Sequence, residues 1–251
     1  MAKKFKDYYD RAYLELLAEK LTPACPEFES EGFIDALNTS LETLEFHQRQ
    51  DLIAEGITRF IPRPYPEILN VFTKILGSEL HTDTGMFTQG WWLWPIGRYV
   101  QINCLQDPEI SYRFIYELTK RFTGEFAIRP LVQNQTQQTL EIMKTWSTDA
   151  NVHVRRLASE GLRTRLPWAG KQTAVLAYPN DLKEILTNLN NAPEKFVQKS
   201  VGNNLNDLYK DAPELAQEII DSWEASNPTK ITQWIIKHGK RNLGNNLRKQ
   251  K

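Results

Sequence analysis

A helical pattern that returns roughly every forty residues constrains this chain more than any other feature of its sequence. Aligning Val154 with Val197 superimposes VRRLASEGLR on VQKSVGNNLN, and aligning Val197 with Ile235 gives a weaker third copy in WIIKHGKRNL. In the first two copies, mostly apolar or small residues fall at i, i+3, i+4, i+7 and i+8, the spacing of one buried helix face. We therefore expect an all-α fold, a right-handed solenoid of about six HEAT-like helical repeats.

Helices are expected along the whole chain, and no convincing strand pattern is found. LEIMKTW, LKEILTNL and LAQEIIDSW each supply the first helix of a repeat. No linker rich in Gly, Ser or Pro divides the chain, so we expect a single domain over residues 1–251, with a basic, flexible tail from about residue 244. The expected helices span residues 5–21, 31–44, 48–60, 108–122, 124–133, 136–147, 151–165, 179–190, 194–209, 212–225 and 228–242.

Composition excludes several classes of protein. Apolar residues make up 41% and charged residues 25% of the chain, which is ordinary for a soluble globular protein and far from disorder. Cys25 and Cys104 are far apart and the four histidines are scattered, so neither a metal centre nor another cofactor is expected. The N-terminal segment interleaves charged and apolar residues, so we expect no signal peptide, no membrane span and a cytoplasmic protein.

Charge is distributed unevenly, although the formal net charge is zero. Residues 225–251 contain seven bases and no acid. In the helix at 151–165, the face opposite the apolar stripe carries Arg156, Glu160 and Arg163. A row of cations along successive second helices suits a phosphate backbone, so we expect a concave DNA-binding face. The equivalent positions of the next two repeats are basic or amide residues, namely Lys199, Asn203 and Asn206, then Lys237 and Arg241.

The stretch NVHVRRLASEGLRTRLPW, residues 151–168, holds the densest cluster of charge. Its first residue is a suitable N-cap, and its proline ends the helix, which leaves the final tryptophan at the helix exit. Residues 152–172 contain five bases, among them Arg155 and Arg165, but only one acid, Glu160. The spacing alone is also typical of a solvent-exposed ladder of Arg–Glu ion pairs.

A carboxylate in a cationic groove repels the phosphates near it, so Glu160 has either a structural or a chemical role. It either orients Arg156 and Arg163 through helical ion pairs or takes part in catalysis. A second candidate, Glu125, is expected in the helix of the preceding repeat. There Arg129 at i+4 is the alternative, purely structural partner.

Three stretches together resemble a known family. They are RFTGEFAIRP at 121–130, NVHVRRLASEGLRTRLPW at 151–168 and KFVQKSVGNNLNDLYKDAPE at 195–214. The chain resembles the bacterial alkylpurine DNA glycosylases built from HEAT-like repeats, and among these the AlkC type rather than the AlkD type. The resemblance implies an enzyme that excises cationic N-alkylated bases from duplex DNA by hydrolysing the N-glycosidic bond without base flipping. N3-methyladenine is the chief expected lesion, and N3-methylcytosine is a second candidate.

The resemblance also implies roles for particular residues. It carries Glu125 and Glu160 over as the catalytic carboxylates, with Phe126 beside the first. Arg156 is expected to reach into the DNA, and Trp168 to lie against the lesion nucleotide. The further residues expected to bind DNA are Arg155, Arg163, Arg165, Lys199, Asn203, Lys237 and Arg241.

The resemblance bears on partners as well. The expected partner is double-stranded DNA containing alkylated bases, with no obligate protein partner and a monomeric chain. Some members of the family carry an immunoglobulin-like domain after the repeats. This sequence ends in a basic tail instead, so we expect that domain to be lacking.

Two other classes of protein stay open. A non-catalytic HEAT-like protein that binds damaged or branched DNA would also need a basic concave face, but could do without the carboxylates. A protein-binding scaffold would present apolar or acidic residues on that face. The basic residues Arg156, Lys199 and Lys237 argue against the scaffold.

Overall fold

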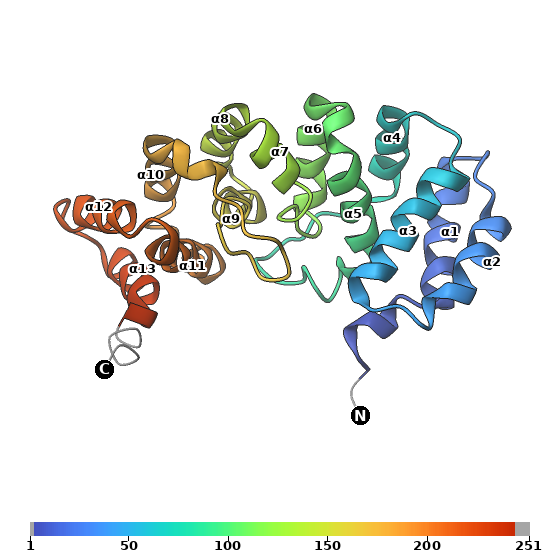
Figure 1. Ribbon diagram of the computed structural model, residues 1–251, viewed down its shortest axis with the longest axis horizontal. Helices are drawn as coiled ribbons and strands as arrows, with labels where there is room; N and C mark the ends of the chain where they lie inside the picture. Colours follow the sequence, from blue (N-terminus) through green and yellow to red (C-terminus); the bar gives the residue numbers. More distant parts are fainter. Residues whose placement is uncertain (1–2, 244–251) are drawn as a thin grey trace. The chain divides into compact units, whose positions relative to one another are not determined.

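The computed structural model of the chain describes residues 3–243, and in this range every element of secondary structure is helical (Figure 1). The expected all-α class is therefore confirmed for these residues. Packing divides the chain into two compact units, Met1–Ala127 (unit 1) and Ile128–Lys251 (unit 2). The tail expected from residue 244 lies outside the described residues. Within the described range, no helix is both long enough and apolar enough to span a membrane.

Unit 1 is built from two rows of helices. Helices α1, α4 and α6 lie side by side in one row, α3 packs against α5 in the other, and α2 contacts both α1 and α3. Buried aromatic side chains, among them Phe33, Phe72 and Tyr99, fill its interior. The helices of unit 1 are α1 (Arg11–Ala24), α2 (Ser30–Leu41), α3 (Phe46–Phe60), α4 (Tyr65–Ile75), α5 (Trp94–Asn103) and α6 (Pro108–Thr119).

Helix α1 begins and ends later than the sequence pattern predicts. Asp10 caps it by accepting a hydrogen bond from the backbone N–H of Tyr13 at 3.2 Å. A cap of this kind marks a helix start, because its side chain supplies the acceptor that a first-turn N–H otherwise lacks. The residues before it form a separate 3-10 turn, η1 (Phe5–Tyr8), and at the other end Pro23 lies inside the last turn.

Unit 2 also has two rows, and they reproduce the predicted repeats. Helices α8, α10 and α12 pack in one row, and α9, α11 and α13 pack in the other (Figure 1). Val154, Val197 and Ile235, at equivalent positions of the second helices, are all buried, so the three aligned repeats are confirmed. The helices of unit 2 are α7 (Arg129–Asn134), α8 (Thr136–Trp146), α9 (Val152–Glu160), α10 (Pro179–Asn188), α11 (Lys195–Asp211), α12 (Pro213–Glu224) and α13 (Lys230–Gly239).

The helix expected at 124–133 is shorter than predicted. Helix α7 begins only at Arg129, with Pro130 in its first turn. Proline lacks the N–H that a helix interior needs and is accommodated only where that N–H would have no helical partner. Glu125 and Phe126 therefore lie in a turn that precedes α7. The prediction that Glu125 lies on a helix is wrong, because the proline marks the start of this helix and not its middle.

The helix expected at 151–165 is also shorter, since α9 ends at Glu160. A Cβ added at Gly161 would lie 2.9 Å from a methyl group of Ile128 and 3.1 Å from the carbonyl oxygen of Leu157. The backbone thus passes so close to its neighbours that only glycine fits without displacing them. The residues that follow leave the helix and form a loop, so the predicted helical extension to residue 165 is wrong.

Candidate functional site

Glu160, the last residue of α9, lies at the centre of a buried cluster of charged side chains in unit 2. It is 5% exposed. Its Oε1 atom lies 2.8 Å from Nη1 of Arg163 and 3.4 Å from Nη2 of Arg156. The nearest contact of each arginine with Glu160 is with the same carboxylate oxygen.

Two opposed effects set the charge of Glu160. Burial alone would raise the pKa of this carboxyl group, because it disfavours the charged form. The positive charges of Arg156 and Arg163 outweigh burial and lower the pKa of Glu160 below its ordinary value. Glu160 is therefore an anion at neutral pH although little solvent reaches it.

Arg163 links Glu160 to a second buried carboxylate, which the sequence did not single out. Its Nε donates to Oδ2 of Asp207, on α11, at 2.8 Å, and both residues are buried. Two carboxylates offset the cost of removing one guanidinium group from water. The solvent-exposed ion-pair ladder considered from the sequence is therefore not what the structure shows. Contact between Arg163 and DNA stays a prediction.

Arg156 completes the surroundings of Glu160. Its side chain is 11% exposed, and its guanidinium carbon lies 5.0 Å from the centre of the Phe196 ring. An arginine over an aromatic face is held by cation–π attraction. Arg156 is therefore fixed between an acid and an aromatic ring while part of its side chain remains accessible.

Arg129 fastens one side of the loop formed by residues 161–173, which we call the Trp168 loop. Its Nη1 donates to the carbonyl oxygen of Arg163 at 3.0 Å, and its Nη2 to that of Gly170 at 2.7 Å. Gln172 donates in turn to the carbonyl oxygen of Arg129 at 2.8 Å. Spacing in the sequence offered Arg129 as a helical partner of Glu125 and gave no sign of this anchoring role.

Asp211, the last residue of α11, fastens the other side of the Trp168 loop. Its carboxylate accepts a hydrogen bond from the Thr164 hydroxyl at 2.7 Å, from Arg165 at 2.9 and 2.7 Å, and contacts the Lys171 ammonium at 2.7 Å. Burial raises the pKa of Asp211, but these partners prevail and hold that pKa well below its ordinary value. The sequence contained only a weak indication of this anchor. Asp207 and Asp211 lie four residues apart near the end of a helix, and that helix follows a basic segment.

Replacing Asp211 by Asn is expected to lower the free energy of unfolding at pH 7 by about 1 to 3 kcal/mol, because several charge-assisted hydrogen bonds are lost. A depressed pKa contributes stability above the pKa of the unfolded state, and that stability is lost as pH falls toward the folded-state pKa. The difference between wild type and Asp211→Asn should therefore shrink as pH drops below about 4. Urea unfolding at pH 7 and pH 3 measures this difference in the free energy of unfolding. Asp221→Asn, at an exposed residue, is the control. A difference that is equal at both pH values would contradict the ion-pair account.

Trp168 is presented to solvent by this doubly anchored loop. Its side chain is 63% exposed and its φ angle is 63°. A left-handed backbone at a bulky residue costs about 1 to 3 kcal/mol and persists only where surrounding contacts impose it. Strain of this kind, combined with a large exposed apolar ring, is typical of a binding site.

Two further arginines predicted to bind DNA have partners within unit 2. Arg155 donates to the carbonyl oxygen of Asp149 at 2.6 Å and to Oε1 of Glu194 at 2.5 Å, which ties the start of α9 to the segment before α11. Arg165 is paired with Asp211, yet 43% of its side chain is exposed. Contact with DNA stays a prediction for both, and the exposure of Arg165 makes it the more accessible of the two.

Glu125, the second predicted carboxylate, belongs to unit 1. It is 6% exposed, its Oε2 accepts from the Thr123 hydroxyl at 3.0 Å, and its backbone N–H donates to the same hydroxyl at 3.3 Å. Phe126 packs on the buried ring of Trp94 with centroids 5.5 Å apart, and both rings line a small crevice with Arg98. Glu125 is thus a second carboxylate that is fixed in place and largely shielded from water.

Residues of the predicted basic track lie on the last two helices of its row, and DNA binding by them stays a prediction. Asn206 does not lie on the exposed face, because it is buried and donates to the carbonyl oxygen of Gly239 at 2.8 Å. Lys199 on α11 and Lys237 on α13 are exposed. Asn203 is half-buried, and its Oδ1 accepts a hydrogen bond from Nη2 of Arg241 at 3.0 Å. Helix α11 packs against both α9 and α13, so unit 2 carries these groups on adjoining helices.

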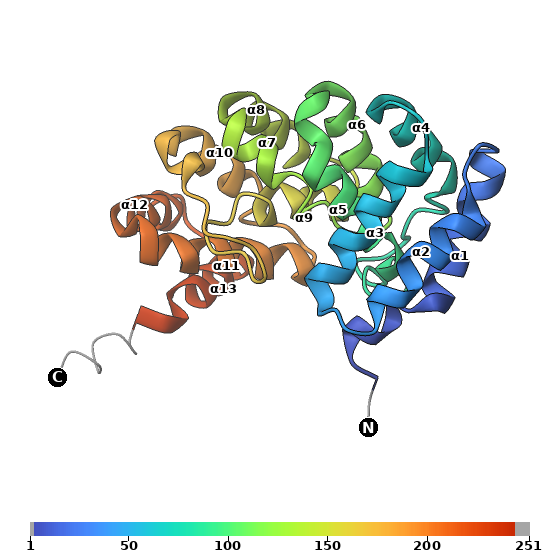
Figure 2. The same ribbon diagram turned by 45° about the vertical axis from the view of Figure 1, so that its right-hand side comes forward.

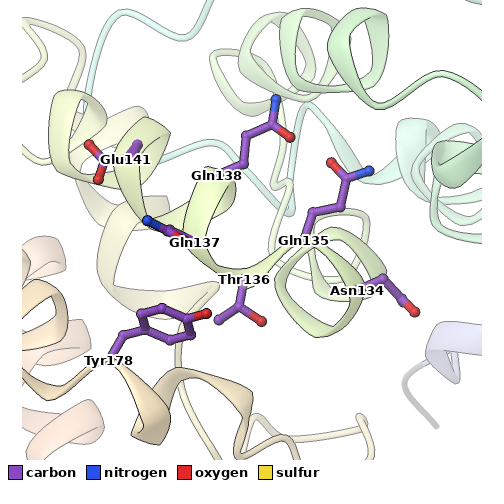
Figure 3. Close-up of a pocket in the computed structure, with 7 residues that line it drawn as sticks. All are labelled: Asn134, Gln135, Thr136, Gln137, Gln138, Glu141 and Tyr178. Atoms are coloured by element: carbon purple, nitrogen blue, oxygen red, sulfur yellow. The ribbon is translucent and has the colours of Figure 1, made fainter.

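A separate depression in unit 2 differs from this surface in chemistry. Figure 3 shows its lining, in which amide and hydroxyl side chains predominate and one carboxylate, that of Glu141, is present. No lysine or arginine lines it, so it is poorly suited to a phosphate backbone. Its lining residues are Asn134, Gln135, Thr136, Gln137, Gln138, Glu141 and Tyr178.

Metal-binding side chains do not gather in the part of the chain that the structure describes. No three His, Cys, Asp or Glu residues in that part form a group able to hold a metal ion. Cys25 and Cys104 are both buried and unpaired with each other. The candidate site consists of carboxylates, arginines and aromatic rings.

Comparison with known proteins supports the resemblance seen in the sequence. The model of the family described as DNA alkylation repair enzyme matches residues 124–243. The solved structure of the alkylpurine DNA glycosylase AlkC of Pseudomonas fluorescens, bound to DNA containing an abasic site analog, is 33% identical with a TM-score of 0.84. That match covers 97% of this chain and 65% of the AlkC chain.

Two further relatives help to place the chain. The uncharacterized protein YhaZ of Bacillus subtilis (strain 168) is 31% identical over 239 residues, which cover 95% of this chain and 64% of YhaZ. This chain therefore spans just under two thirds of the length of both AlkC and YhaZ. The structure of AlkD2 from Streptococcus mutans is 20% identical with a TM-score of 0.52 over 84% of this chain and 97% of AlkD2, and shows likeness of fold alone.

The helical repeat fold, the match to the family model and the similarity to AlkC agree with one another. Similarity to the AlkC structure is greater than to AlkD2 in both sequence and fold, which confirms the resemblance to AlkC seen in the sequence. Residues 124–243 match the model of the DNA alkylation repair enzyme family, and the chain as a whole is similar to AlkC.

Proposed function

We propose that this protein is a DNA glycosylase that hydrolyses the N-glycosidic bond of an alkylated base in duplex DNA. One observation carries the proposal: the buried carboxylate of Glu160 is kept anionic by two arginines, beside a surface rich in cations. The match of residues 124–243 to the family model and the similarity to AlkC support it. The lesion we propose is a cationic N-alkylated base, chiefly N3-methyladenine and secondly N3-methylcytosine.

The chemistry of such a lesion suits a carboxylate. When the bond between C1′ and the base breaks, its electron pair goes to the base and neutralises the positive charge there. The sugar becomes an oxocarbenium-like cation, to which the oxygen of a water molecule then bonds while a proton leaves. An anion held near C1′ stabilises that cation and accepts or directs the proton of the water.

The contacts of Glu160 support its place in this step. Arg156 and Arg163 both contact Oε1, and we assign the carboxylate of Glu160 to the sugar or the water. The two guanidinium groups keep the carboxylate ionised, and they fix its orientation before the substrate arrives. Preorganised charge in a site shielded from water costs little reorganisation during the reaction.

We assign the second carboxylate role to Glu125, with Phe126 beside it. The Thr123 hydroxyl holds the Glu125 side chain in one orientation, and the ring of Phe126, the next residue, packs on Trp94. A buried acid that is fixed in place is suited to electrostatic stabilisation of a cation. Units 1 and 2 are proposed to act together as one DNA-binding domain, and the chain as a monomer.

Trp168 is proposed to lie against the lesion nucleotide. Its exposed indole and the anchored loop that carries it provide a rigid aromatic face. A cationic nucleotide on an indole gains roughly 0.5 to 2 kcal/mol from cation–π attraction. Recognition on an exposed ring is compatible with excision of the base without flipping it into a pocket.

The direct test is release of N3-methyladenine from methylated duplex DNA by the purified wild-type protein, followed by chromatography. Release that leaves abasic sites in the DNA supports the glycosylase. A folded protein that binds the duplex but releases no base would support the non-catalytic DNA-binding alternative instead.

Replacing Trp168 by Ala is expected to lower base release about 2- to 30-fold, while binding to undamaged duplex falls much less, because the cation–π contact requires the charged lesion. Single-turnover release and fluorescence anisotropy measure the two effects. Tyr178→Ala, in the amide-rich depression, is the aromatic control. Equal losses of release and of binding to undamaged DNA would count against a contact with the lesion.

A further inference from the structure

His238 on α13 lies in a notch where two helices approach closely. A Cβ added at Gly202, on α11, would lie 2.7 Å from Cδ2 of His238, so only glycine leaves room for the imidazole. On its other side the imidazole stacks on Trp234, with centroids 4.9 Å apart and planes 12° from parallel. The position of the ring is thus fixed by packing, while its edge lines a surface hollow with Lys237 and Arg241.

Hydrogen bonds fix the tautomer of His238. Its Nε2 lies 3.1 Å from Oδ1 of Asn203, and the same oxygen accepts a hydrogen bond from Nη2 of Arg241 at 3.0 Å. Because a guanidinium group can only donate, the Asn203 atom between them is the carbonyl oxygen. An amide oxygen can only accept, so Nε2 carries the hydrogen in the neutral ring. Any proton taken up by His238 therefore goes to Nδ1.

Cations converge on this ring from the neighbouring elements. Lys195 and Lys199 come from α11, Lys237 from α13 itself, and Lys240 and Arg241 from η5 (Lys240–Asn242). Burial lowers the pKa of His238, and the charges of Arg241, Lys195 and Lys199 lower it further. Burial and Lys199 likewise lower the pKa of Lys195, whose ammonium group lies over the Trp234 ring. Neighbouring cations thus oppose the positive charges of His238 and Lys195, whereas Asp207 favours the charge of Arg241.

The carboxylates on the adjoining helices are already engaged. Asp207 accepts from Arg163 at 2.8 Å, and Glu224 of α12 lies 3.8 Å from Lys240. An anion supplied from outside would therefore relieve the mutual repulsion of the cations around His238. In a protein whose surface suits DNA, the backbone phosphodiester is the anion that fits this chemistry.

We propose that Lys195, Lys199, His238 and Arg241 bind one DNA backbone phosphate, and that Nδ1 of His238 takes up a proton when the phosphate is bound. The proposal rests on the DNA-binding part of the proposed function and not on base excision. A phosphate near the ring favours the imidazolium form and raises the pKa of His238 in the complex. Affinity for DNA then rises as pH falls from the bound-state pKa toward the free-state pKa, because the complex binds the extra proton.

The test is binding of an undamaged duplex to the full chain between pH 5.5 and 8 at constant ionic strength, followed by fluorescence anisotropy. If phosphate raises the pKa of His238 by about one unit, wild-type affinity should increase by up to about tenfold as pH falls across this range. In His238→Gln most of this increase should disappear. His81→Gln removes an exposed histidine of unit 1 and should keep the wild-type dependence. Equal pH dependence in His238→Gln and wild type would overturn the proposal.

A second measurement covers the case in which His238→Gln disturbs packing against Gly202. Magnetic resonance of wild-type protein with labelled histidine reports the pKa of His238 with and without duplex, and a pKa unchanged by DNA would also overturn the proposal. Lys199→Gln should reduce the log–log salt dependence of binding by about 0.9, the value for one phosphate contact. Base release is measured separately, so the two proposals can fail independently. If the protein releases base but His238→Gln keeps the pH dependence of DNA binding, only the phosphate-binding proposal is wrong. If His238→Gln loses that pH dependence but no base is released, only the proposed glycosylase activity is wrong.

Discussion

Replacing Glu160 by Gln is expected to lower the rate of base release about 10²- to 10⁴-fold, the range found when a catalytic acid, base or charge-stabilising group is removed. The physical reason is that a neutral amide neither stabilises the cationic sugar nor accepts a proton from water. Binding of undamaged duplex should survive, because the cations of the surface are unchanged. Single-turnover release of N3-methyladenine, with duplex binding measured in parallel, gives both quantities.

The structure supplies the controls for this experiment. Glu160 offsets the charges of Arg156 and Arg163, so the unfolding transition of Glu160→Gln must be measured to separate lost chemistry from lost stability. Glu141→Gln removes a carboxylate from the amide-rich depression and should leave release unchanged. If Glu160→Gln stays folded and releases base at the wild-type rate, then Glu160 serves only to orient the two arginines.

Replacing Glu125 by Gln is expected to lower base release about 10²- to 10³-fold, the cost typical of removing one fixed electrostatic group from a site shielded from water. The Thr123 hydroxyl, which donates to Glu125 at 3.0 Å, can still bond to the amide oxygen. The backbone of the turn should therefore keep its form. The same single-turnover assay measures the loss.

Glu109→Gln is the matched control in unit 1, because Glu109 is an exposed acid on α6 paired with Arg113. Its release rate should equal that of the wild type. A further variant, Thr123→Val, should reproduce a smaller part of the Glu125→Gln loss, since it leaves the charge but removes the group that orients it. If Glu125→Gln releases base at the wild-type rate, then Glu160 acts without a second catalytic carboxylate.

The arrangement of helices could be predicted from the sequence because local rules govern it. Apolar spacing in three aligned segments identified the second helices of three repeats, and Val154, Val197 and Ile235 are buried as that spacing requires. Helix ends were less predictable. Pro130 lies in the first turn of a helix that the apolar pattern began earlier, and α9 ends at Glu160 although the pattern carried it to residue 165.

For the site, the sequence by itself pointed to Glu160, because one carboxylate among five bases is conspicuous in composition. The roles expected of Glu125 and Trp168 came from the resemblance to a known family. The sequence could not show that Glu160 and Arg163 are buried, since charged residues at helical spacing are usually solvated. Only the tertiary structure decided that, through Asp207, which lies on another helix and lets Arg163 be removed from water.

The same distinction holds for Trp168. The sequence placed this residue just beyond a helix, but its presentation depends on Arg129 and Asp211, which are distant in sequence and near in space. Apolar residues at helical spacing predict which side chains are buried, because all residues on one face of a helix pack against the same neighbouring helix. Anchoring by single side chains from other helices has no periodicity, so only the folded chain reveals it.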